Sequence, residues 1–411
     1  MAMRVEVLNT GTELLLGHVV NTHLKYLAEA LFPVGLRIGR QVTVPDGDPI
    51  RDALAETFGR ADIVIVTGGL GPTTDDVTRE AVAELLGLEL VHDPEVMAAI
   101  EARFARRGMQ MSERNARQAQ RPREATVLAN ANGTAPGLYV PPLERAVRTP
   151  HLFLLPGPPR ELKPMFEDAV LPILRSVVPS GSAAGMRNFR LSGLGESLVE
   201  QRIGPALLAI GIELGYCARP GEVDVRTIGA PELLERAEVI IRERLGEHIV
   251  SLDERSMEKV VVDLLIERGA TVATAESCTG GHLANCLTNV PGASAVFLEG
   301  FVTYANEAKT RALGVDADLI AAHGAVSAEV ASAMAEGALE KAGVDFALAT
   351  TGIAGPGGGS DAKPVGTVFI ALASKDRETQ VQRFRFATDR ETFKSLTVQA
   401  ALDLLRRALA V

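Results

Sequence analysis

Short apolar segments alternate with amphipathic helical segments in two separate stretches of this chain, and this alternation limits the fold more than any other feature. In the first stretch, the strands are predicted at residues 4–9, 37–44, 62–67, 126–130 and 151–156. The helices between them are predicted at residues 22–31, 74–86 and 94–107. Such alternation with short connections is typical of a mostly parallel sheet covered by helices on both faces. In that architecture ligands bind beyond the carboxyl ends of the strands.

The same alternation returns after residue 255. Strands are predicted near residues 271–276, 296–304, 346–351, 366–373 and 380–386, with a final helix from residue 390. The intervening segment has a different pattern: a strand at 188–192, a helix at 196–203, a hairpin over 213–228 turning at Pro220-Gly221, and a helix at 231–245. We therefore expect two α/β domains, residues 1–175 and 254–411, joined by a small α+β module at residues 176–253.

Composition narrows the class of protein. The chain of 411 residues favours about two to four domains. A formal net charge of -10 argues against sequence-independent binding to nucleic acid or to anionic membranes. Three cysteines without a CxxC pair predict a reduced compartment and no structural zinc. Because charged residues interrupt the first apolar positions, and no apolar run reaches the roughly 18 residues of a membrane helix, we expect a cytoplasmic protein without a signal peptide.

Two glycine-rich turns follow strands of the first stretch. They have the sequences GTELLLG at residues 11–17 and TGGLGPTTDDVT at residues 67–78. Glycines in such turns let backbone N–H groups approach an anion. Thr73 and Thr74 are expected to cap the helix predicted at 74–86.

Four carboxylates accompany these turns. Asp75 and Asp76 are expected in the first turn of the following helix, where an aspartate can simply complement the helix dipole. Glu13 and Asp46 also follow strands, and this gathering of carboxylates beside an anion-binding turn favours a second interpretation. Hard oxygen ligands of this kind suit Mg²⁺ or Mn²⁺ bridging a pyrophosphate.

A third turn is rich in proline. It has the sequence LPGPPRELKP at residues 155–164, with two cations, Arg160 and Lys163. The turn is interpreted either as a stiff loop carrying solvated charges or as a further phosphate contact.

The second stretch contains two adjacent nucleophile-capable side chains. An apolar strand ends in the sequence TAESCTGG at residues 274–281, which places Ser277 and Cys278 just before a pair of glycines and a predicted helix. A turn from a strand into a helix directs its first residues and its free N–H groups beyond the sheet edge. The pattern is therefore typical of an active-site turn.

Residues 4–170 resemble the molybdopterin-binding fold and, more closely, the amino-terminal domain of the CinA (competence/damage-inducible protein A) family. The motifs that carry the resemblance are GTELLLG, TGGLGPTTDDVT, NGTAPG at 132–137 and LPGPPRELKPMF at 155–166. It implies a nucleotide-pyrophosphate site and metal-dependent hydrolysis of ADP-ribose to AMP and ribose 5-phosphate. The nucleotide-binding residues it implies are Gly11, Thr12, Gly68, Gly69, Gly71, Thr73, Asp75, Pro156 and Gly157. Asp46 and Asp76 match acidic positions of the related enzymes, and with Glu13 they are the candidates for metal binding or acid–base chemistry.

The middle module resembles the KH-like domain of CinA proteins. A KH domain that binds RNA needs a Gly-x-x-Gly loop with basic neighbours. The glycines at 193, 195, 204 and 211 do not form one. We therefore expect a spacer or a homodimer-forming module and no nucleic-acid partner.

Residues 256–410 resemble the nicotinamide-nucleotide amidase domain, which converts nicotinamide mononucleotide to nicotinate mononucleotide and ammonia. The motifs that carry this resemblance are AESCTGG at 275–281, GFVTYANEAK at 300–309, TGIAGPGGG at 351–359 and KPVGT at 363–367. In the resemblance, Ser277, Tyr304 and Lys309 fall on the catalytic positions, and no metal is implied. The substrate-binding candidates are Cys278, Thr279, Gly280, Gly352, Gly355, Lys363 and Arg390.

Amide hydrolysis has requirements that these residues can meet. It needs an activated nucleophile, a proton donor for the leaving ammonia, and donors for the tetrahedral oxyanion. Ser277 can attack if a desolvated Lys309 with a lowered pKa takes its proton. Tyr304 can relay or donate that proton, and the N–H groups of Cys278 and Thr279 can form the oxyanion hole.

Other interpretations stay open on the residues alone. Cys278 is a competing nucleophile, because a thiol at a helix amino terminus is activated. Glu276-Ser277 can be a simple helix cap, and His282 and His323 are possible bases. The alternative class is a non-catalytic nucleotide-binding or scaffolding protein of the competence or DNA-damage response, which the family name suggests.

Overall fold

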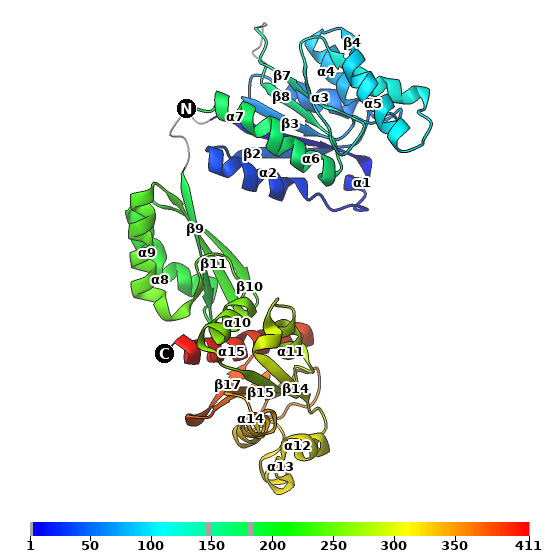
Figure 1. The fold of residues 1–411 in the computed structure, drawn as a ribbon. Helices are drawn as coiled ribbons and strands as arrows, with labels where there is room; N and C mark the ends of the chain where they lie inside the picture. Colours follow the sequence, from blue (N-terminus) through cyan, green and yellow to red (C-terminus); the bar gives the residue numbers. More distant parts are fainter. Residues whose placement is uncertain (1–2, 145–148, 180–183, 411) are drawn as a thin grey trace. The chain divides into compact units, whose positions relative to one another are not determined.

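The computed structural model describes residues 3–144, 149–179 and 184–410. The chain divides into two compact units, Met1–Ala184 and Gly185–Val411 (Figure 1). The α/β class predicted for both ends of the chain and the α+β class predicted for the middle module are confirmed. No helix of the described residues is long and apolar enough to cross a membrane.

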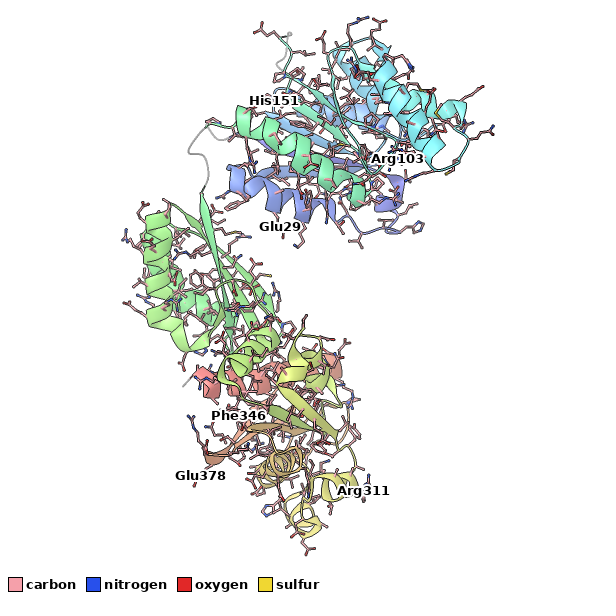
Figure 2. All side chains as sticks on the ribbon, in the orientation of Figure 1. Glu29, Arg103, His151, Arg311, Phe346 and Glu378 are labelled. Atoms are coloured by element: carbon pink, nitrogen blue, oxygen red, sulfur yellow. The ribbon has the colours of Figure 1, made fainter. Side chains whose placement is uncertain are left out.

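The first unit contains a six-stranded sheet in the order β2-β1-β3-β8-β7-β6. Its strands are β1 (Val5–Thr10), β2 (Ile38–Val44), β3 (Ile63–Thr67), β6 (Thr126–Leu128), β7 (Gly137–Val140) and β8 (His151–Leu155). Strands β2, β1, β3 and β8 are parallel, whereas β7 and β6 extend the sheet in antiparallel pairs. Strand β7 was not predicted. His151 of β8, labelled in Figure 2, forms a hydrogen bond with Tyr139 of β7, because its Nδ1 lies 2.9 Å from the Tyr139 hydroxyl.

Helices cover both faces of this sheet, and the central strands have buried side chains on each face. Val7, Ile65 and Phe153 belong to one hydrophobic cluster, and their neighbours Val64 and Leu154 belong to another. The helices of the unit are α1 (Thr12–Leu15), α2 (His23–Leu31), α3 (Pro49–Thr57), α4 (Thr78–Leu86), α5 (Pro94–Arg106), α6 (Pro159–Met165) and α7 (Leu171–Val177). Helices α2, α6 and α7 pack on the first cluster and α3 and α4 on the second. A two-stranded sheet, β4 (Leu90–His92) with β5 (Gln120–Pro122), lies outside the main one.

The helix predicted at 74–86 begins only at Thr78, so its predicted start was wrong. The Asp76 carboxylate accepts hydrogen bonds from the Thr73 N–H, at 2.9 Å, and from the Thr73 hydroxyl. These bonds close a turn ahead of the helix, whose N-cap Val77 makes no side-chain capping bond. Thr73 and Thr74 therefore do not cap α4, and Asp75 and Asp76 precede its first turn.

The second unit begins with an antiparallel sheet in the order β10-β11-β9-β12. Its elements are β9 (Gly185–Ser192), α8 (Glu196–Ala209), β10 (Glu213–Arg219), β11 (Glu222–Gly229), α9 (Pro231–Leu245) and β12 (Ile249–Ser251). The predicted hairpin turn at Pro220-Gly221 is confirmed, and its Gly221 has a left-handed φ of 81°. Both helices pack on one face of this sheet through a shared cluster that includes Phe189, Ile203 and Ile241.

The rest of the second unit is built on a five-stranded sheet in the order β14-β13-β15-β16-β17. Its strands are β13 (Val272–Glu276), β14 (Phe297–Val302), β15 (Phe346–Gly352), β16 (Thr367–Ser374) and β17 (Arg377–Arg385). Its helices are α10 (Met257–Arg268), α11 (His282–Thr288), α12 (Asn306–Leu313), α13 (Ala317–His323), α14 (Ala328–Ala342) and α15 (Arg390–Ala410). Strands β14, β13 and β15 are parallel, and β16 and β17 are antiparallel.

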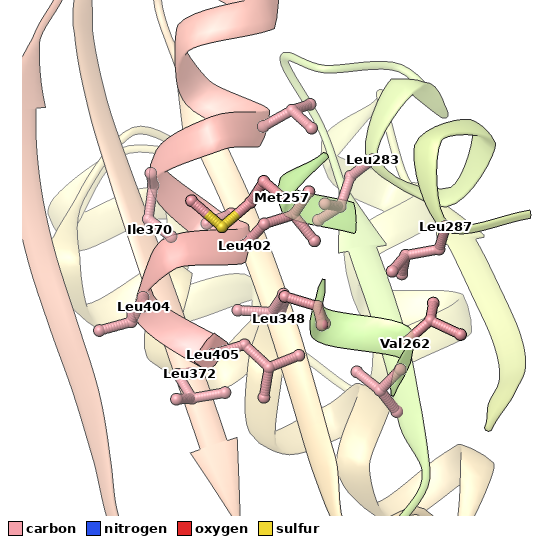
Figure 3. Packing of buried hydrophobic residues seen from close by; sticks show 14 of the residues in the cluster. Met257, Val262, Leu283, Leu287, Leu348, Ile370, Leu372, Leu402, Leu404 and Leu405 are labelled. Carbon is pink, nitrogen blue, oxygen red and sulfur yellow. The ribbon is translucent and has the colours of Figure 1, made fainter. Parts of the chain in front are cut away.

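Figure 3 shows the core that holds α10, α11 and α15 against one face of this sheet. Leu348 and Ile370 of the sheet lie in one cluster with Leu402 of α15, Met257 of α10 and Leu283 of α11. Each fully buried side chain of this kind stabilises the fold by about 1.5–3 kcal/mol. Helix α14 covers the opposite face. The carboxyl ends of β13 and β15 are therefore fixed from both sides.

Candidate active sites

Ser277 and Lys309 lie side by side at the end of strand β13. Ser277 follows the last strand residue, and its N–H is anchored on the Thr350 carbonyl of β15 at 2.9 Å. Lys309, on α12, is only 1% exposed, and its Nζ lies 3.1 Å from Ser277 Oγ. The structure thus brings together two residues that are thirty-two positions apart in the sequence.

Two backbone carbonyls complete the surroundings of the Lys309 amine. Nζ donates to the Thr303 carbonyl at 2.9 Å and to the Tyr304 carbonyl at 3.2 Å. Burial lowers the pKa of Lys309, while the nearby Cys278 and Glu307 oppose this shift. A neutral amine has two N–H groups and one lone pair. Nζ also donates to Ser277 Oγ, at 3.1 Å. When the amine loses a proton, the two carbonyls, which can only accept, can keep its two N–H groups, and its lone pair then faces the Ser277 hydroxyl.

Cys278 lies close enough to Lys309 to affect its pKa, but its side chain belongs to the hydrophobic core. Its side chain is buried in the hydrophobic cluster under α10, α11 and α15. Burial raises the pKa of the thiol to about 12. The helix that follows begins at His282, with Gly281 as its N-cap, so neither Ser277 nor Cys278 lies at the helix start. The capping alternative for Glu276-Ser277 is therefore wrong for Ser277 but right for Glu276, whose carboxylate accepts N–H groups of the first helical turn. The thiol lacks the activation that a nucleophile needs.

The turn from Ser277 to Gly281 is held by Glu276, for which only a capping role together with Ser277 was considered from the sequence. Its carboxylate is fully buried and accepts the N–H groups of Gly281 at 2.9 Å, Leu283 at 3.0 Å and Ala284 at 2.8 Å. These are donors that the first turn of a helix leaves unsatisfied. An acidic residue directly before a nucleophile was the only signal in the sequence for this function.

Backbone donors remain available beside Ser277. Among the described residues, the N–H groups of Cys278 and Thr279 have no oxygen acceptor, and the Cys278 N–H lies within reach of its own sulfur. Both N–H groups are candidates to bind an oxyanion. The Thr279 hydroxyl is instead fixed by that of Thr350, at 2.7 Å. Gly280, at φ 61°, lies next to Lys394 of α15, because a Cβ at this glycine would be 3.9 Å from Lys394 Nζ.

Tyr304 and Arg390 form a second contact at this edge. Arg390 donates to the Tyr304 hydroxyl at 3.0 Å and to the Gly355 carbonyl at 3.0 Å. The Tyr304 side chain is largely exposed, and only its backbone carbonyl bonds Lys309. The hydroxyl predicted to relay a proton therefore lies beside Arg390, without a hydrogen bond to Ser277 or Lys309.

The other predicted substrate-binding and base residues of this domain lie around the Ser277–Lys309 and Tyr304–Arg390 pairs. Gly352 ends β15 opposite Val368, where a Cβ would lie 2.8 Å from the Thr367 carbonyl oxygen. Lys363 donates to the His323 carbonyl at 2.9 Å and makes no bond with Arg390. His323 Nδ1 lies 3.2 Å from a Glu329 carboxylate oxygen. Within the described chain, neither His282 nor His323 forms a hydrogen bond with Ser277.

The first unit contains a pocket of about 360 Å³ beyond the carboxyl ends of its parallel strands. Most of the residues predicted for nucleotide or metal binding line it: Gly11, Glu13, Asp46, Gly68, Gly69, Gly71, Asp75, Asp76, Pro156 and Gly157. Thr12 and Thr73 are attached to this set by hydrogen bonds to Asp46 and Asp76. Gln118, Thr134 and Glu161 also line the pocket and were not predicted.

Glycine is required where the turn after β3 meets its neighbours. Gly68 has φ 101° and Gly69 has φ 68°. A Cβ at Gly68 would lie 2.5 Å from Thr10 Oγ1, and one at Gly69 would overlap Thr78 Oγ1. Arg79, which the sequence did not indicate, is 1% exposed and donates to the Leu70 carbonyl at 2.6 Å. An arginine in an amphipathic helix gives no sign that it will turn inward to hold a loop.

The pocket carboxylates can supply some, but not all, of the ligands of a divalent ion. Among the described residues, no three acidic, histidine or cysteine side chains converge on one point. Asp46 Oδ2 already accepts from the Thr12 N–H at 2.9 Å, and Asp76 Oδ2 from Thr73. Mg²⁺ is commonly bound by one or two carboxylates, with water and substrate phosphates as the other ligands. The donor set fits an ion that arrives with a pyrophosphate.

Comparisons with known proteins cover nearly all of the chain. Residues 254–409 match the CinA C-terminal domain, residues 6–176 the probable molybdopterin binding domain, and residues 186–251 the damage-inducible protein CinA KH domain. A CinA-like protein of Akkermansia muciniphila is 47% identical over 401 residues, covering 97% of this chain and 96% of that protein. A putative competence-damage inducible protein of Caldicellulosiruptor bescii is 44% identical over 416 residues, covering 99% of each. A solved structure, the competence/damage inducible protein CihA from Agrobacterium tumefaciens, is 41% identical and covers 38% of this chain and 98% of that chain, with a TM-score of 0.36.

Proposed function

The chain belongs to the CinA family, as its motifs predicted, and we propose that its carboxy-terminal domain hydrolyses the amide of nicotinamide mononucleotide to nicotinate mononucleotide and ammonia. One observation carries the proposal: the buried Lys309 Nζ lies 3.1 Å from Ser277 Oγ and is bonded to two carbonyls that can only accept. This arrangement prepares a neutral amine to act as a base toward a serine.

The reaction proceeds in two halves. In the first, Lys309 takes the Ser277 proton as Oγ attacks the carboxamide carbon, and the oxyanion is bound by the N–H groups of Cys278 and Thr279. The C–N bond then breaks, the Lys309 ammonium returns the proton to the leaving nitrogen, and ammonia departs from an ester on Ser277. In the second half, a water molecule attacks that ester, giving its proton to Lys309, and the carboxylic acid product leaves as Ser277 regains a proton.

The substrate phosphate needs cations near this turn. Arg390 begins α15 beside Gly355, and Lys394, one helical turn further, lies next to Gly280. Within the described chain, Lys394 has no carboxylate partner. These two cations suit a phosphate dianion held over the turn. Lys363, bonded to the His323 carbonyl, is a more remote candidate.

We further propose that the amino-terminal pocket hydrolyses ADP-ribose to AMP and ribose 5-phosphate. When bound, a divalent ion such as Mg²⁺ would be held by Asp46 or Asp76 and would neutralise pyrophosphate charge. The N–H groups of the turn from Gly68 to Gly71 are suited to the phosphate oxygens. Glu13 is the carboxylate left to orient a water. A homodimer and a cytoplasmic location stay predictions from the sequence.

The test uses the full chain with nicotinamide mononucleotide in EDTA, measuring ammonia. We expect release of ammonia that is abolished in Ser277→Ala and retained in Cys278→Ala. Loss of turnover in Cys278→Ala alone, with a folded protein, would overturn the serine mechanism. Tight nucleotide binding with no turnover of either nucleotide would favour the scaffolding class instead.

A further inference from the structure

A second pocket of the first unit, with a volume of about 490 Å³, lies between helix α5 and the segment that joins β6 to β7. We call it the α5 pocket. The joining segment has the sequence ANANGTAP at residues 129–136. Its Thr134 lines both the α5 pocket and the pyrophosphate pocket, so the two pockets are neighbours across one short loop. The described lining of the α5 pocket includes no residue that the sequence predicted for nucleotide or metal binding.

The loop between the two pockets is held in one shape by its own hydrogen bonds. Asn130 Oδ1 accepts from the N–H groups of Asn132, at 2.9 Å, and Gly133, at 2.7 Å. Asn130 Nδ2 donates to the Ala135 carbonyl at 2.7 Å and to the carboxylate of Glu161, in the pyrophosphate pocket, at 2.9 Å. The wall between the pockets is therefore fixed, and it sets the spacing of ligand groups bound on its two sides.

Two arginines line the α5 pocket close to this loop. Arg103 and Arg106 are three positions apart on α5, so they lie on the same face of the helix. Arg103, labelled in Figure 2, donates from Nη1 to the Ala131 carbonyl at 2.8 Å, which holds its guanidinium beside the loop. Arg106 is exposed. Within the described chain, neither arginine contacts a carboxylate, and the Arg106 guanidinium makes no hydrogen bond. The pocket therefore has uncompensated positive charge at this end.

The carboxylates of the α5 pocket lie toward the amino terminus of the helix. That of Asp93 is already bound by Arg121, at 2.8 Å, and by the N–H groups of Glu95, at 3.1 Å, and Val96, at 3.2 Å. Glu95 is exposed and precedes Arg103 by eight positions, which is about 12 Å along a helix. Neither carboxylate therefore neutralises the arginine end of the pocket.

Between its two ends the α5 pocket is mainly apolar. Val96, Ala99 and Ile100 line it from the helix, and Val127 and Pro136 line it from the opposite side. Arginine binds phosphate through paired N–H groups whose planar arrangement matches the phosphate oxygens. An apolar lining next to two such groups suits a ligand with an uncharged body and one phosphate.

From these observations we propose that the α5 pocket binds a phosphate monoester on the nucleoside end of the substrate, so that the amino-terminal domain prefers ADP-ribose 2′-phosphate to ADP-ribose. In that ligand one ribose separates the pyrophosphate from the added phosphate, as one loop separates the two pockets. Arg103 binds Ala131, which is three residues, or at most about 11 Å of chain, from the shared Thr134. The inference rests on the function proposed for the pyrophosphate pocket.

The experiment compares the affinities of the full chain for ADP-ribose 2′-phosphate and ADP-ribose, by titration calorimetry in EDTA. We expect the 2′-phosphate to bind about tenfold more tightly or better, since it adds charge-assisted hydrogen bonds. Arg103→Gln and Arg106→Gln should each remove most of this preference and leave ADP-ribose binding unchanged. Arg107→Gln, at an exposed position outside both pockets, makes the same change of charge and is the matched control.

Hydrolysis in Mg²⁺ gives a second readout, because the ratio of kcat/KM for the two nucleotides should fall in the same variants. Thermal unfolding checks that each variant is folded. Equal affinities of the native chain for the two nucleotides, or a preference that both pocket variants retain, overturn the inference, while ADP-ribose binding leaves the proposed function standing. Absence of binding in EDTA and of turnover in Mg²⁺, for both nucleotides, contradicts the proposed function and this inference with it.

Discussion

The two α/β domains both place their chemical groups beyond the carboxyl ends of parallel strands, but they treat these groups in opposite ways. In the amino-terminal pocket, Glu13 and Asp75 are exposed and Asp46 and Asp76 are half-buried. In the carboxy-terminal site, Lys309 is buried and every hydrogen bond of its amine is assigned. Hydrolysis at a serine needs a base whose pKa is moved by burial, whereas a pocket for a metal-bound pyrophosphate must admit charge and water. The same strand-end position therefore provides two different environments, one buried around an amine and one open around carboxylates.

Removing the buried amine should have the largest effect. Lys309→Met is expected to lower the amidase kcat by about 10³-fold or more, because the serine loses its base. Lys341→Met, at an exposed position of α14, is the matched control and should retain full activity. Single-turnover measurement of ammonia release checks this. A Lys309→Met enzyme with near-native kcat would show that the buried amine is not the base, and the contrast with the amino-terminal pocket would then fail.

Removing metal or a pocket carboxylate should affect only the other domain. EDTA, or Asp76→Asn, is expected to lower ADP-ribose hydrolysis by about 100-fold and to leave ammonia release unchanged, since the two sites use separate groups. Both products are measured in the same samples. Hydrolysis of ADP-ribose that continues in EDTA would contradict the metal proposal.

Disturbing the support under the serine turn should have an intermediate effect. Glu276→Gln is expected to lower amidase kcat by about 10- to 100-fold, because small displacements of a nucleophile and its oxyanion donors are costly. It should also lower the free energy of unfolding by about 1–3 kcal/mol. Glu299→Gln, on the exposed part of β14, is the control. An unchanged kcat would show that the turn holds its shape without this carboxylate.

Removing the proposed phosphate contact should have a smaller effect that is confined to binding. Lys394→Ala is expected to raise KM for nicotinamide mononucleotide by about three- to tenfold, with little change in kcat, since one partly solvated cation is lost. Steady-state kinetics at low and high salt measure it. A fall in kcat with constant KM would assign Lys394 to the chemical step.

The smallest effect expected is on stability as a function of pH. Because folding lowers the pKa of Lys309, this residue binds fewer protons in the folded than in the unfolded state. The difference exists between its folded-state pKa and its unfolded-state pKa of about 10.4. The free energy of unfolding should therefore rise with pH across that window, relative to Lys309→Met. Urea unfolding of both proteins at about pH 7 and about pH 9.5 measures the change. The opposite slope would show that the folded lysine is held as an ammonium.

Much of the fold could be predicted, because strand and helix periodicity are local properties. The hairpin turn at Pro220-Gly221 and the helix at Pro231–Leu245 were found within a residue. The helix start at Thr78 was not, because the Asp76 carboxylate closes a competing turn with Thr73. Strand β7, which pairs with β6 and with β8 from later in the chain, was missed.

The sequence by itself determined the family, the α/β and α+β classes, and the motifs that bear the chemistry, because each of these is written in contiguous residues. Only the tertiary structure decided which members of those motifs meet. It put Lys309 against Ser277, turned Cys278 into the core, and gave the Tyr304 hydroxyl to Arg390. Whether a side chain is buried, and how many acceptors surround an amine, depends on segments that are distant in the chain. No local sequence pattern carries this information.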